Sequence, residues 1–386
     1  MKLLSTWWDI KVQKQSTINQ IPYIDLKSQH ASLKSELLSS IGEVIDDGNF
    51  ILGEQVTEFE RQFAQLCGVT YAVGVNSGTD ALILALKAIG VRSGDEVITV
   101  PNSFVASTTC IRVLGARPVF VDVGDDYNID PNKIADAITA TTKAIIPVHL
   151  TGRPCNMEPI LAIAKEKGIA VVEDAAQAVL AEYQGKRVGS LGTVGCFSLH
   201  PLKNLGACGD GGVLVTDDAE LYEKLKVMRN IGLRTRDDCV LWSHNSRLDT
   251  LQAAILLVKL RYLHEWAEQR RENARYYQTQ LAGIPQIQVP PEREWEKCVY
   301  HTFVIQAERR DQLRQFLSDR SIGTAIHYPV PIHLSTAGKE LGYTAGSFPI
   351  AEMQSRRILS LPIYQELTVE QLEQVCHNIK LFYQHL

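Results

Sequence analysis

The feature that most constrains the fold is a regular alternation of apolar strands and helices between about residues 54 and 216. The strand candidates are apolar throughout, rather than at every second residue, and they lie at 71–75, 95–101, 118–123, 144–150, 170–175, 194–199 and 211–216. Helical patterns separate several of them, as at 76–90 and 157–168. Strands of this kind, joined through helices, are typical of a largely parallel sheet covered on both faces. In such an α/β fold, ligands bind beyond the carboxyl ends of the strands.

The length of 386 residues predicts one large domain and one smaller domain. A long helical pattern covers residues 248–281, and a proline-rich segment, a strand-like segment and two helices follow it. We therefore expect a large domain over residues 21–264 and a small C-terminal α/β domain over residues 265–386. Residues 1–20 contain a short apolar stretch broken by Asp9 and are expected to extend outside the fold.

The composition excludes several classes of function. A net charge of −5 and a pI of about 6.1 provide no broad basic surface for nucleic acid. No segment has the ~20 consecutive apolar residues that a membrane span needs, and the N-terminus lacks the pattern of a signal peptide. The 8 cysteines show no CxxC pair and no zinc spacing. We expect a cytoplasmic protein with reduced thiols and no bound metal.

An aspartate stands where one of the buried strands ends. Asp174 lies in VVEDAAQAV, residues 171–179, and a carboxylate beside a core needs a partner. It could cap a helix N-terminus. It could also pair with the pyridinium nitrogen of pyridoxal phosphate and keep that ring electron-withdrawing. Both interpretations are open at this point, and in the second Gln177 is placed to reach the ring hydroxyl.

A lysine follows in a glycine-rich loop. Lys203 lies in CFSLHPLKNLGACGDGG, residues 196–212, with Ser198 at the end of the preceding strand. Loop lysines are usually solvated charges, but the glycines here allow a ligand to approach the backbone closely. A lysine that forms a Schiff base needs a lowered pKa, which burial beside another cationic group can supply.

Two other strand ends carry groups that suit the same ligand. Ser77, Gly78 and Thr79 open a helix, and the amides of a helix N-terminus form a phosphate site, although such residues also act as simple caps. Phe104 follows the next strand and is either a core aromatic or a ring that stacks on a bound pyridine. A phosphate site, an aromatic ring, a carboxylate and a lysine at neighbouring strand ends together predict a pyridoxal phosphate site.

Nearly the whole chain, from IPYIDLKSQH at residue 21 to LSLPIYQELTVEQLEQV, resembles the DegT/DnrJ/EryC1/StrS family of nucleotide-sugar aminotransferases. The motifs that carry the resemblance are FILGEQVTEFE, VNSGTDAL, GDEVITVPNSFVAS, PVHLTGRPCNM, EDAAQA, PLKNLGACGDGG, NSRLDTLQAAIL and AIHYPVPIHL. The resemblance implies the fold-type I architecture of aspartate aminotransferase, with a three-layer αβα large domain. It also implies pyridoxal 5'-phosphate, which becomes pyridoxamine 5'-phosphate during turnover. The HLTG and HYPVPIHL segments look most like enzymes that act on dTDP-3-keto-6-deoxyhexoses.

The resemblance also implies roles for single residues. Lys203 would hold the cofactor as a Schiff base, and Asp174 would pair with the ring nitrogen. Gln177 would contact the ring hydroxyl, and Phe104 would stack on the ring. The phosphate would be bound by Ser77, Gly78, Thr79 and Ser198 and, across a homodimer with shared sites, by Asn245 of the other subunit.

Other positions concern the substrate. Arg229 and His327 match basic positions near the substrate mouth, although His327 is equally compatible with an ordinary loop histidine. His200 and Leu202 stand where many members have tyrosine and glycine. Two larger residues, Val179 and Leu180, replace small ones after EDAAQA. These departures leave the catalytic groups in place but could alter the substrate pocket.

The expected reaction is a ping-pong transamination, in which an amino acid, glutamate by family analogy, donates the amino group that a nucleotide-linked keto-sugar receives. Lys203 would anchor the cofactor and act as general acid and base. Two alternatives are a dehydratase of the same family and a non-catalytic regulator that keeps the cofactor site. The dehydratases tend to have histidine at the Schiff-base position, which Lys203 argues against. A nicotinamide dehydrogenase would require GxGxxG where this chain has VNSGTDAL.

Overall fold

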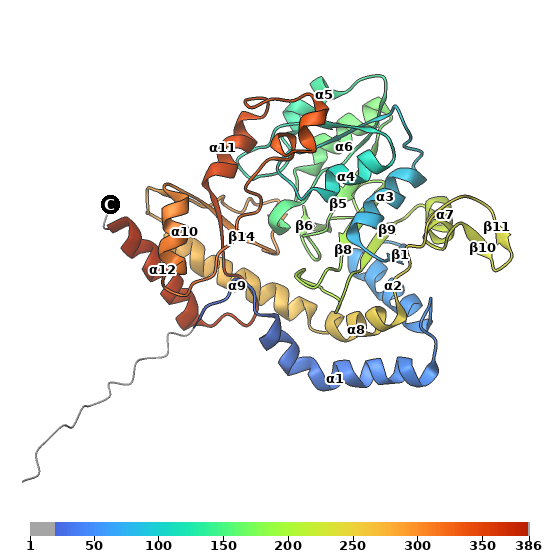
Figure 1. The fold of residues 1–386 in the computed structure, drawn as a ribbon, viewed down its shortest axis with the longest axis horizontal. Helices are drawn as coiled ribbons and strands as arrows, with labels where there is room; N and C mark the ends of the chain where they lie inside the picture. Colours follow the sequence, from blue (N-terminus) through green and yellow to red (C-terminus); the bar gives the residue numbers. More distant parts are fainter. Residues whose placement is uncertain (1–19, 385–386) are drawn as a thin grey trace, which may run out of the picture.

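The computed structural model describes residues 20–384, which fold around a seven-stranded sheet (Figure 1). The strand order is β1 (Tyr71–Val75), β9 (Gly212–Thr216), β8 (Val194–Ser198), β5 (Ala170–Asp174), β4 (Thr142–Ile145), β2 (Glu96–Thr99) and β3 (Arg117–Phe120). The pairs from β8 to β3 are parallel, which confirms the predicted sheet. Strand β9 is antiparallel to both of its neighbours. A loop without a helix joins β8 to β9, and such a connection reverses the chain direction.

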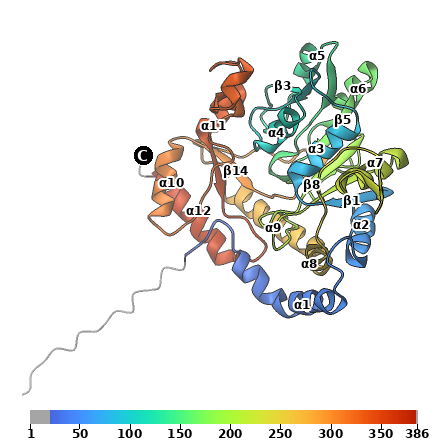
Figure 2. The same ribbon diagram turned by 45° about the vertical axis from the view of Figure 1, so that its right-hand side comes forward.

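Helices pack around the seven-stranded sheet (Figures 1 and 2). Helix α3 (Gly78–Ala88) packs on β8 and β9, and α6 (Met157–Lys167) packs on β5. On the outer strand, β1 contacts α2 (Glu54–Cys67) and α7 (Ala219–Arg229). The remaining large-domain helices are α1 (Leu26–Asp47), α4 (Ala106–Val113), α5 (Ile134–Ala137) and α8 (Thr250–Leu260).

The C-terminal part is built on a second, antiparallel sheet. Its strand order is β12 (Ile287–Gln288), β14 (Phe303–Ala307) and β15 (Ile358–Leu361). Its helices are α9 (Leu263–Leu281), α10 (Arg310–Ser318), α11 (Pro349–Arg357) and α12 (Val369–Gln384). The chain also forms a hairpin of β10 (Leu233–Thr235) and β11 (Asp238–Cys239), and a small sheet of β6 (Glu182–Tyr183), β7 (Lys186–Arg187) and β13 (Glu296–Lys297).

Two hydrophobic clusters underlie the division into domains, and helix α9 passes from one to the other. Leu263 and Ala267, near the start of α9, belong to the cluster around the large sheet, whereas Tyr277 and Leu281 belong to the second cluster. We therefore propose that the division lies within α9, close to the predicted boundary at residue 265. The large domain was predicted to begin at residue 21. Ile21, however, packs in the second cluster, and its backbone bridges to Ile322. The expected extension at residues 1–20 lies outside the described residues, apart from Gln20.

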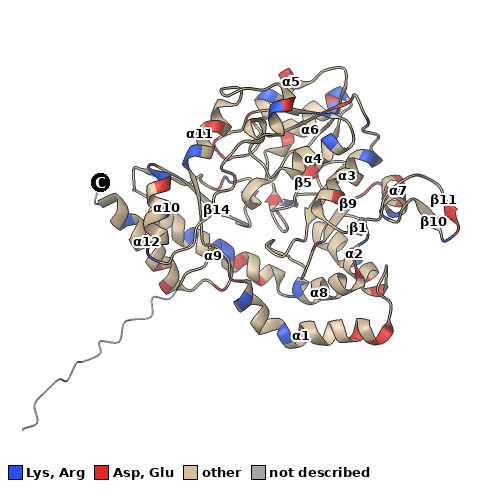
Figure 3. Cartoon of the chain, viewed as in Figure 1, with Lys and Arg blue, Asp and Glu red and all other residues tan. Residues whose placement is uncertain are grey.

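Charged residues of both signs are interspersed along the outer helices (Figure 3). Between residues 20 and 384, no helix is both long and apolar enough to cross a membrane.

Candidate functional site

The carboxyl ends of the large-domain strands meet at one cavity of about 500 Å³. This volume lies in the range of ~300–1,000 Å³ that is usual for small-molecule sites. The structure brings together in its lining eight of the predicted cofactor-binding residues, namely Ser77, Gly78, Thr79, Phe104, Asp174, Gln177, Ser198 and Lys203. They come from four separate strand ends and from the loop between β8 and β9.

Asp174 is buried at the end of β5 and is held by two hydrogen bonds. The Ser107 hydroxyl donates to Oδ2 at 2.8 Å, and the backbone N–H of Ala176 donates to Oδ1 at 3.2 Å. Ser107 is itself within 2.7 Å of the Ser103 hydroxyl. Because no helix begins after β5, helix capping does not explain this carboxylate. Burial raises the pKa of Asp174, and the Ser107 hydrogen bond acts in the opposite direction.

Lys203 lines the same cavity. Burial lowers the pKa of its amine to about 8, although the Asp174 carboxylate opposes this shift. A buried ammonium is destabilised because the low-dielectric surroundings solvate charge poorly. The amine is therefore neutral in a much larger fraction of molecules than an exposed lysine would be, as a nucleophile requires.

The loop that carries Lys203 is anchored by two residues that the sequence did not single out. The Asn204 side chain donates to the Val299 carbonyl at 3.0 Å. Lys259, only 1% exposed, donates from Nζ to the Gly206 carbonyl at 2.6 Å. A lysine in the apolar helix α8 was the available signal, because a buried ammonium needs such acceptors.

The N-terminus of α3 lines the cavity through Ser77, Gly78 and Thr79. Ser77 caps the helix and accepts from the backbone N–H of Asp80 at 3.1 Å. Gly78 and Thr79 are the first two residues of α3, so their amides have no acceptor within the helix. A Cβ on Gly78 would lie 2.6 Å from Cβ of Ser198, so only glycine allows α3 to approach β8 this closely. This arrangement suits a phosphate.

Phe104 and Gln177 both contact Tyr328, a residue that was not predicted from the sequence. The Phe104 side chain is 53% exposed, which excludes a role as a core aromatic, and its ring centroid lies 5.8 Å from that of Tyr328. The Tyr328 hydroxyl lies 3.4 Å from Nε2 of Gln177, whose Oε1 accepts from the backbone N–H of Thr151 at 2.7 Å. Burial raises the pKa of Tyr328 to about 12. Its position within the HYPVPIHL motif was the available signal.

The residues that depart from the common pattern separate into two groups. His200 and Leu202 line the cavity, and Leu202 is 43% exposed. Val179 and Leu180 do not line it, and both are buried in the hydrophobic core. The expectation that Val179 and Leu180 shape the pocket is therefore not supported by their position.

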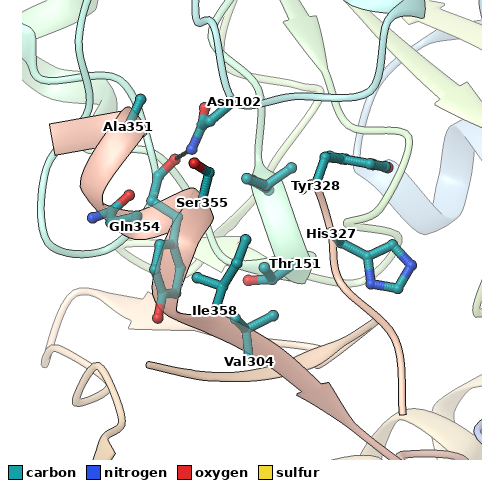
Figure 4. Close-up of a pocket in the computed structure, with 11 residues that line it drawn as sticks. Asn102, Thr151, Val304, His327, Tyr328, Ala351, Gln354, Ser355 and Ile358 are labelled. Carbon is teal, nitrogen blue, oxygen red and sulfur yellow. Dashed lines mark hydrogen bonds between the residues drawn. The ribbon is translucent and has the colours of Figure 1, made fainter. Parts of the chain in front are cut away.

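His327 lies at the edge of the cavity and hydrogen-bonds through Nδ1 to the Ser360 hydroxyl at 2.9 Å. Burial lowers its pKa to about 4, so its ring is neutral at pH 7. A neighbouring cavity shares His327 and Tyr328 with this one and is also lined by Asn102 and Gln354 (Figure 4). Its volume of about 10 Å³ holds no more than a water molecule.

Arg229 lies elsewhere. It stands in the last turn of α7, pairs with Glu60 of α2, and donates from Nη1 to the Gly74 carbonyl at 2.9 Å. Glu60 also accepts from the Gly74 N–H at 2.6 Å. Arg229 is buried and does not line the cavity. The structure therefore corrects the expected place at the substrate mouth, because this guanidinium joins two helices to β1.

We expect Arg229→Met to lower the free energy of unfolding by about 3–5 kcal/mol, because it leaves the buried Glu60 carboxylate without a countercharge. Urea unfolding measures the loss. The double variant Glu60→Gln/Arg229→Met should recover much of it. A raised KM for substrate with an unchanged free energy of unfolding would instead support a substrate-binding role for Arg229.

Asn245 also lies outside the cavity. It is exposed, and its backbone bridges to Asn230 at the end of α7. Trp242, a few residues before it, is 89% exposed.

The lining of the cavity fits the chemical parts of pyridoxal phosphate. The N-terminus of α3 matches the phosphate, Asp174 and the Phe104 ring match the pyridinium ring, and the Lys203 amine matches the aldehyde. Burying a carboxylate and a lysine destabilises the folded protein. A ligand that uses both groups explains why they lie in the cavity.

Known proteins match this chain over almost its full length. The DegT/DnrJ/EryC1/StrS aminotransferase family matches residues 31–380. A protein of Geobacillus stearothermophilus named "Pleiotropic regulatory protein" is 44% identical, over 95% of this chain and 99% of the relative. The dTDP-3-amino-3,4,6-trideoxy-alpha-D-glucose transaminase of Streptomyces venezuelae is 42% identical, over 94% and 96%.

Among solved structures, S. venezuelae DesV in complex with a ketimine intermediate superimposes with a TM-score of 0.93. The two sequences are 41% identical, over 95% of this chain and 99% of that one.

Proposed function

The chain belongs to the DegT/DnrJ/EryC1/StrS aminotransferase family, and we propose that it transfers an amino group from glutamate to a dTDP-linked 3-keto-6-deoxyhexose. As a family member it is a pyridoxal-phosphate-dependent nucleotide-sugar aminotransferase. The observation that carries the assignment to this site is the pairing, in one cavity, of Lys203 with a buried Asp174.

When bound, the cofactor supplies an aldehyde that links to amines and a ring that withdraws electrons from the attached carbon. Lys203 would hold the cofactor in the resting enzyme, and its amine would be free once the amino donor has taken its place. The free amine would then remove the proton from Cα of the donor, and would later deliver a proton to the sugar carbon that receives the amino group. Asp174, held by Ser107, would keep the ring nitrogen protonated, and the amides of Gly78 and Thr79 would hold the phosphate.

The lowered pKa of Lys203 predicts how uptake of the cofactor depends on pH. Only the neutral amine attacks an aldehyde, and with a pKa of about 8 roughly a tenth of the amine is neutral at pH 7. We expect the rate of covalent uptake of pyridoxal phosphate by cofactor-free enzyme to rise about ten-fold from pH 7 towards a plateau above pH 8. Stopped-flow absorbance measures this rate. A rise that continued to pH 10 would show an ordinary lysine.

We further propose a homodimer whose two sites each need both subunits. The support is that Asn245 matches a phosphate-binding position of the family, yet lies exposed outside its own cavity, near the exposed Trp242. A second copy would bury this apolar surface and bring Asn245 to the partner's cofactor.

Hybrid dimers test this sharing. Lys203→Ala and Asn245→Ala chains, co-expressed with different tags, should form a hybrid with one intact site, because the intact Lys203 and Asn245 meet there. We expect activity well above that of either parent dimer. A hybrid no more active than its parents would place both groups in one subunit's site.

The proposed reaction is tested in two steps with purified enzyme. Glutamate alone should displace Lys203 from the cofactor, convert the cofactor to its amino form and release 2-oxoglutarate. A non-catalytic regulator would not carry out this reaction. The aminated enzyme should then convert a dTDP-linked 3-keto-6-deoxyhexose to the amino sugar, detected by mass spectrometry. Conversion of a UDP-linked 4-keto-sugar in place of the dTDP compound would contradict the assigned sugar but not the transaminase activity.

The regulator is the second candidate, because one relative of 44% identity carries a regulatory name. Lys203 and the buried Asp174 favour the enzyme. A regulator that only binds the cofactor has no need of an amine free to move protons.

A further inference from the structure

A third histidine lines the cavity together with His200 and His327, and neither the cofactor-binding nor the proton-transfer roles use it. His301 lies just before β14 and reaches the cavity from the C-terminal sheet. The other two cavity histidines each make a hydrogen bond, His200 to the backbone N–H of Leu202 at 3.3 Å and His327 to Ser360 at 2.9 Å. Within the described part of the chain, the imidazole of His301 has no hydrogen-bond partner, and its Nδ1 is buried.

The backbone around His301 is fixed on several sides. The Val299 N–H donates to the Gly152 carbonyl at 2.9 Å, and Arg270 donates to the Tyr300 carbonyl at 3.2 Å. Gly152 has φ +87°, and a Cβ there would lie 2.9 Å from the backbone nitrogen of His301, so the two loops pack backbone to backbone. The Asn204 side chain, next to Lys203, holds the same segment. The backbone of His301 is thus fixed, while its ring lacks a hydrogen-bond partner in the described part of the chain. A ligand in the cavity that the ring lines can supply that partner.

The chemistry of His301 selects the kind of ligand. Burial, and next the charge of Lys203, lower the pKa of His301 well below its ordinary value, so the ring is neutral. A neutral imidazole offers one N–H donor and one acceptor, which matches a hydroxyl group. A carboxylate, by contrast, is bound best by a charged donor. Of the two substrates, the keto-sugar carries the hydroxyls and the amino donor carries the carboxylates.

We propose that His301 is a substrate-binding residue that hydrogen-bonds a hydroxyl of the sugar and makes no corresponding contact with the amino-acid donor. The inference rests on the proposed function, since it assigns a subsite within the same cavity.

The two half-reactions separate this role from others. Glutamate and a dTDP-3-amino-3,6-dideoxyhexose, which is the sugar half-reaction in reverse, both discharge the lysine-linked cofactor and produce the same absorbance change. We expect His301→Phe and His301→Ala to lower the kcat/KM of the amino-sugar step about ten-fold or more, and to leave the glutamate step unchanged. His301→Asn, which keeps a donor and an acceptor, should recover part of the loss.

A binding measurement and a control complete the test. The Kd of a dTDP-linked 6-deoxyhexose with a C3 hydroxyl, which cannot react, should rise about ten-fold in the holoenzyme of His301→Ala. His377→Phe is the matched control, because His377 is exposed on α12.

Equal losses in both half-reactions, or no loss in either, would overturn the role of His301. A wild-type enzyme that reacts with glutamate but with no dTDP-amino sugar would contradict the proposed sugar instead. The same comparison would then be made with a UDP-linked amino sugar and would still decide the role of His301.

Discussion

Replacing Lys203 by alanine is expected to abolish amino transfer and to remove the absorbance band of the lysine-linked cofactor. The side chain provides both the covalent anchor and the group that moves the proton, so its loss should reduce kcat by more than the ~10²–10⁴-fold typical of a general base alone. The structure supports this expectation because Lys203 lines the same cavity as Asp174 and has a pKa lowered to about 8. Single-turnover absorbance with glutamate measures the effect.

The control for this variant is Lys186→Ala, because Lys186 is exposed on β7 and lies outside the cavity. It should keep both turnover and absorbance. The Lys203→Ala protein should unfold as cooperatively as the wild type, since Nζ of Lys203 makes no hydrogen bond to residues 20–384, and the loop is anchored by Asn204 and Lys259. A Lys203→Ala enzyme that turned over at the wild-type rate would disprove the assigned anchor.

The second large effect is expected at Asp174. Asp174→Asn keeps the size of the side chain but removes the negative charge that would face the pyridinium nitrogen. Without that charge the ring loses its proton and withdraws electrons poorly, so removal of the proton from Cα should slow by about 10²–10³-fold, as for the loss of other preorganised electrostatic groups. The rate of the glutamate half-reaction measures it, with Lys203 still linked to the cofactor.

Ser107 refines the Asp174 prediction. Ser107→Ala removes the 2.8 Å hydrogen bond to the carboxylate, so it should slow the same step less than Asp174→Asn does. Asp46→Asn, at an exposed position on α1, serves as the matched control. If Asp174→Asn reacted with glutamate at the wild-type rate, the carboxylate would have only a structural role.

The residues at the strand ends were the part of the site most easily predicted from the sequence. Apolar strands followed by Ser77, Phe104, Asp174 or Ser198 could be recognised because parallel strands place their carboxyl ends at one edge. The cavity contains these residues together with Lys203. Their gathering depends on local pattern and on one topological rule, both of which can be read in a single chain.

Contacts between distant segments could not be read in the same way. Arg229 looked like a substrate residue, but its position is set by Glu60 on α2, far away in the sequence. His301 reaches the cavity from the C-terminal part because the carbonyls of Gly152 and Thr151 hold its segment. Tyr328 reaches it beside Gln177, and no local pattern indicates either packing.

The end of one helix and the start of the next were equally hidden. The long helical pattern at 248–281 is divided between α8 and α9 at Arg261 and Tyr262, where neither glycine nor proline marks a break. The turn there is made by the Tyr262 N–H, which donates to the Lys259 carbonyl at 3.1 Å. Because α8 packs on α1 and α2 while α9 continues to the second cluster, the change of direction is set by tertiary packing.

The most direct measurement is the position of the covalent link itself. The purified enzyme, incubated with pyridoxal phosphate and reduced with borohydride, is digested and sequenced by tandem mass spectrometry. We predict a phosphopyridoxyl group on Lys203, and its loss when glutamate is added before the reductant. A label on any other lysine, or a label on Lys203 that glutamate did not remove, would contradict the assigned role of Lys203.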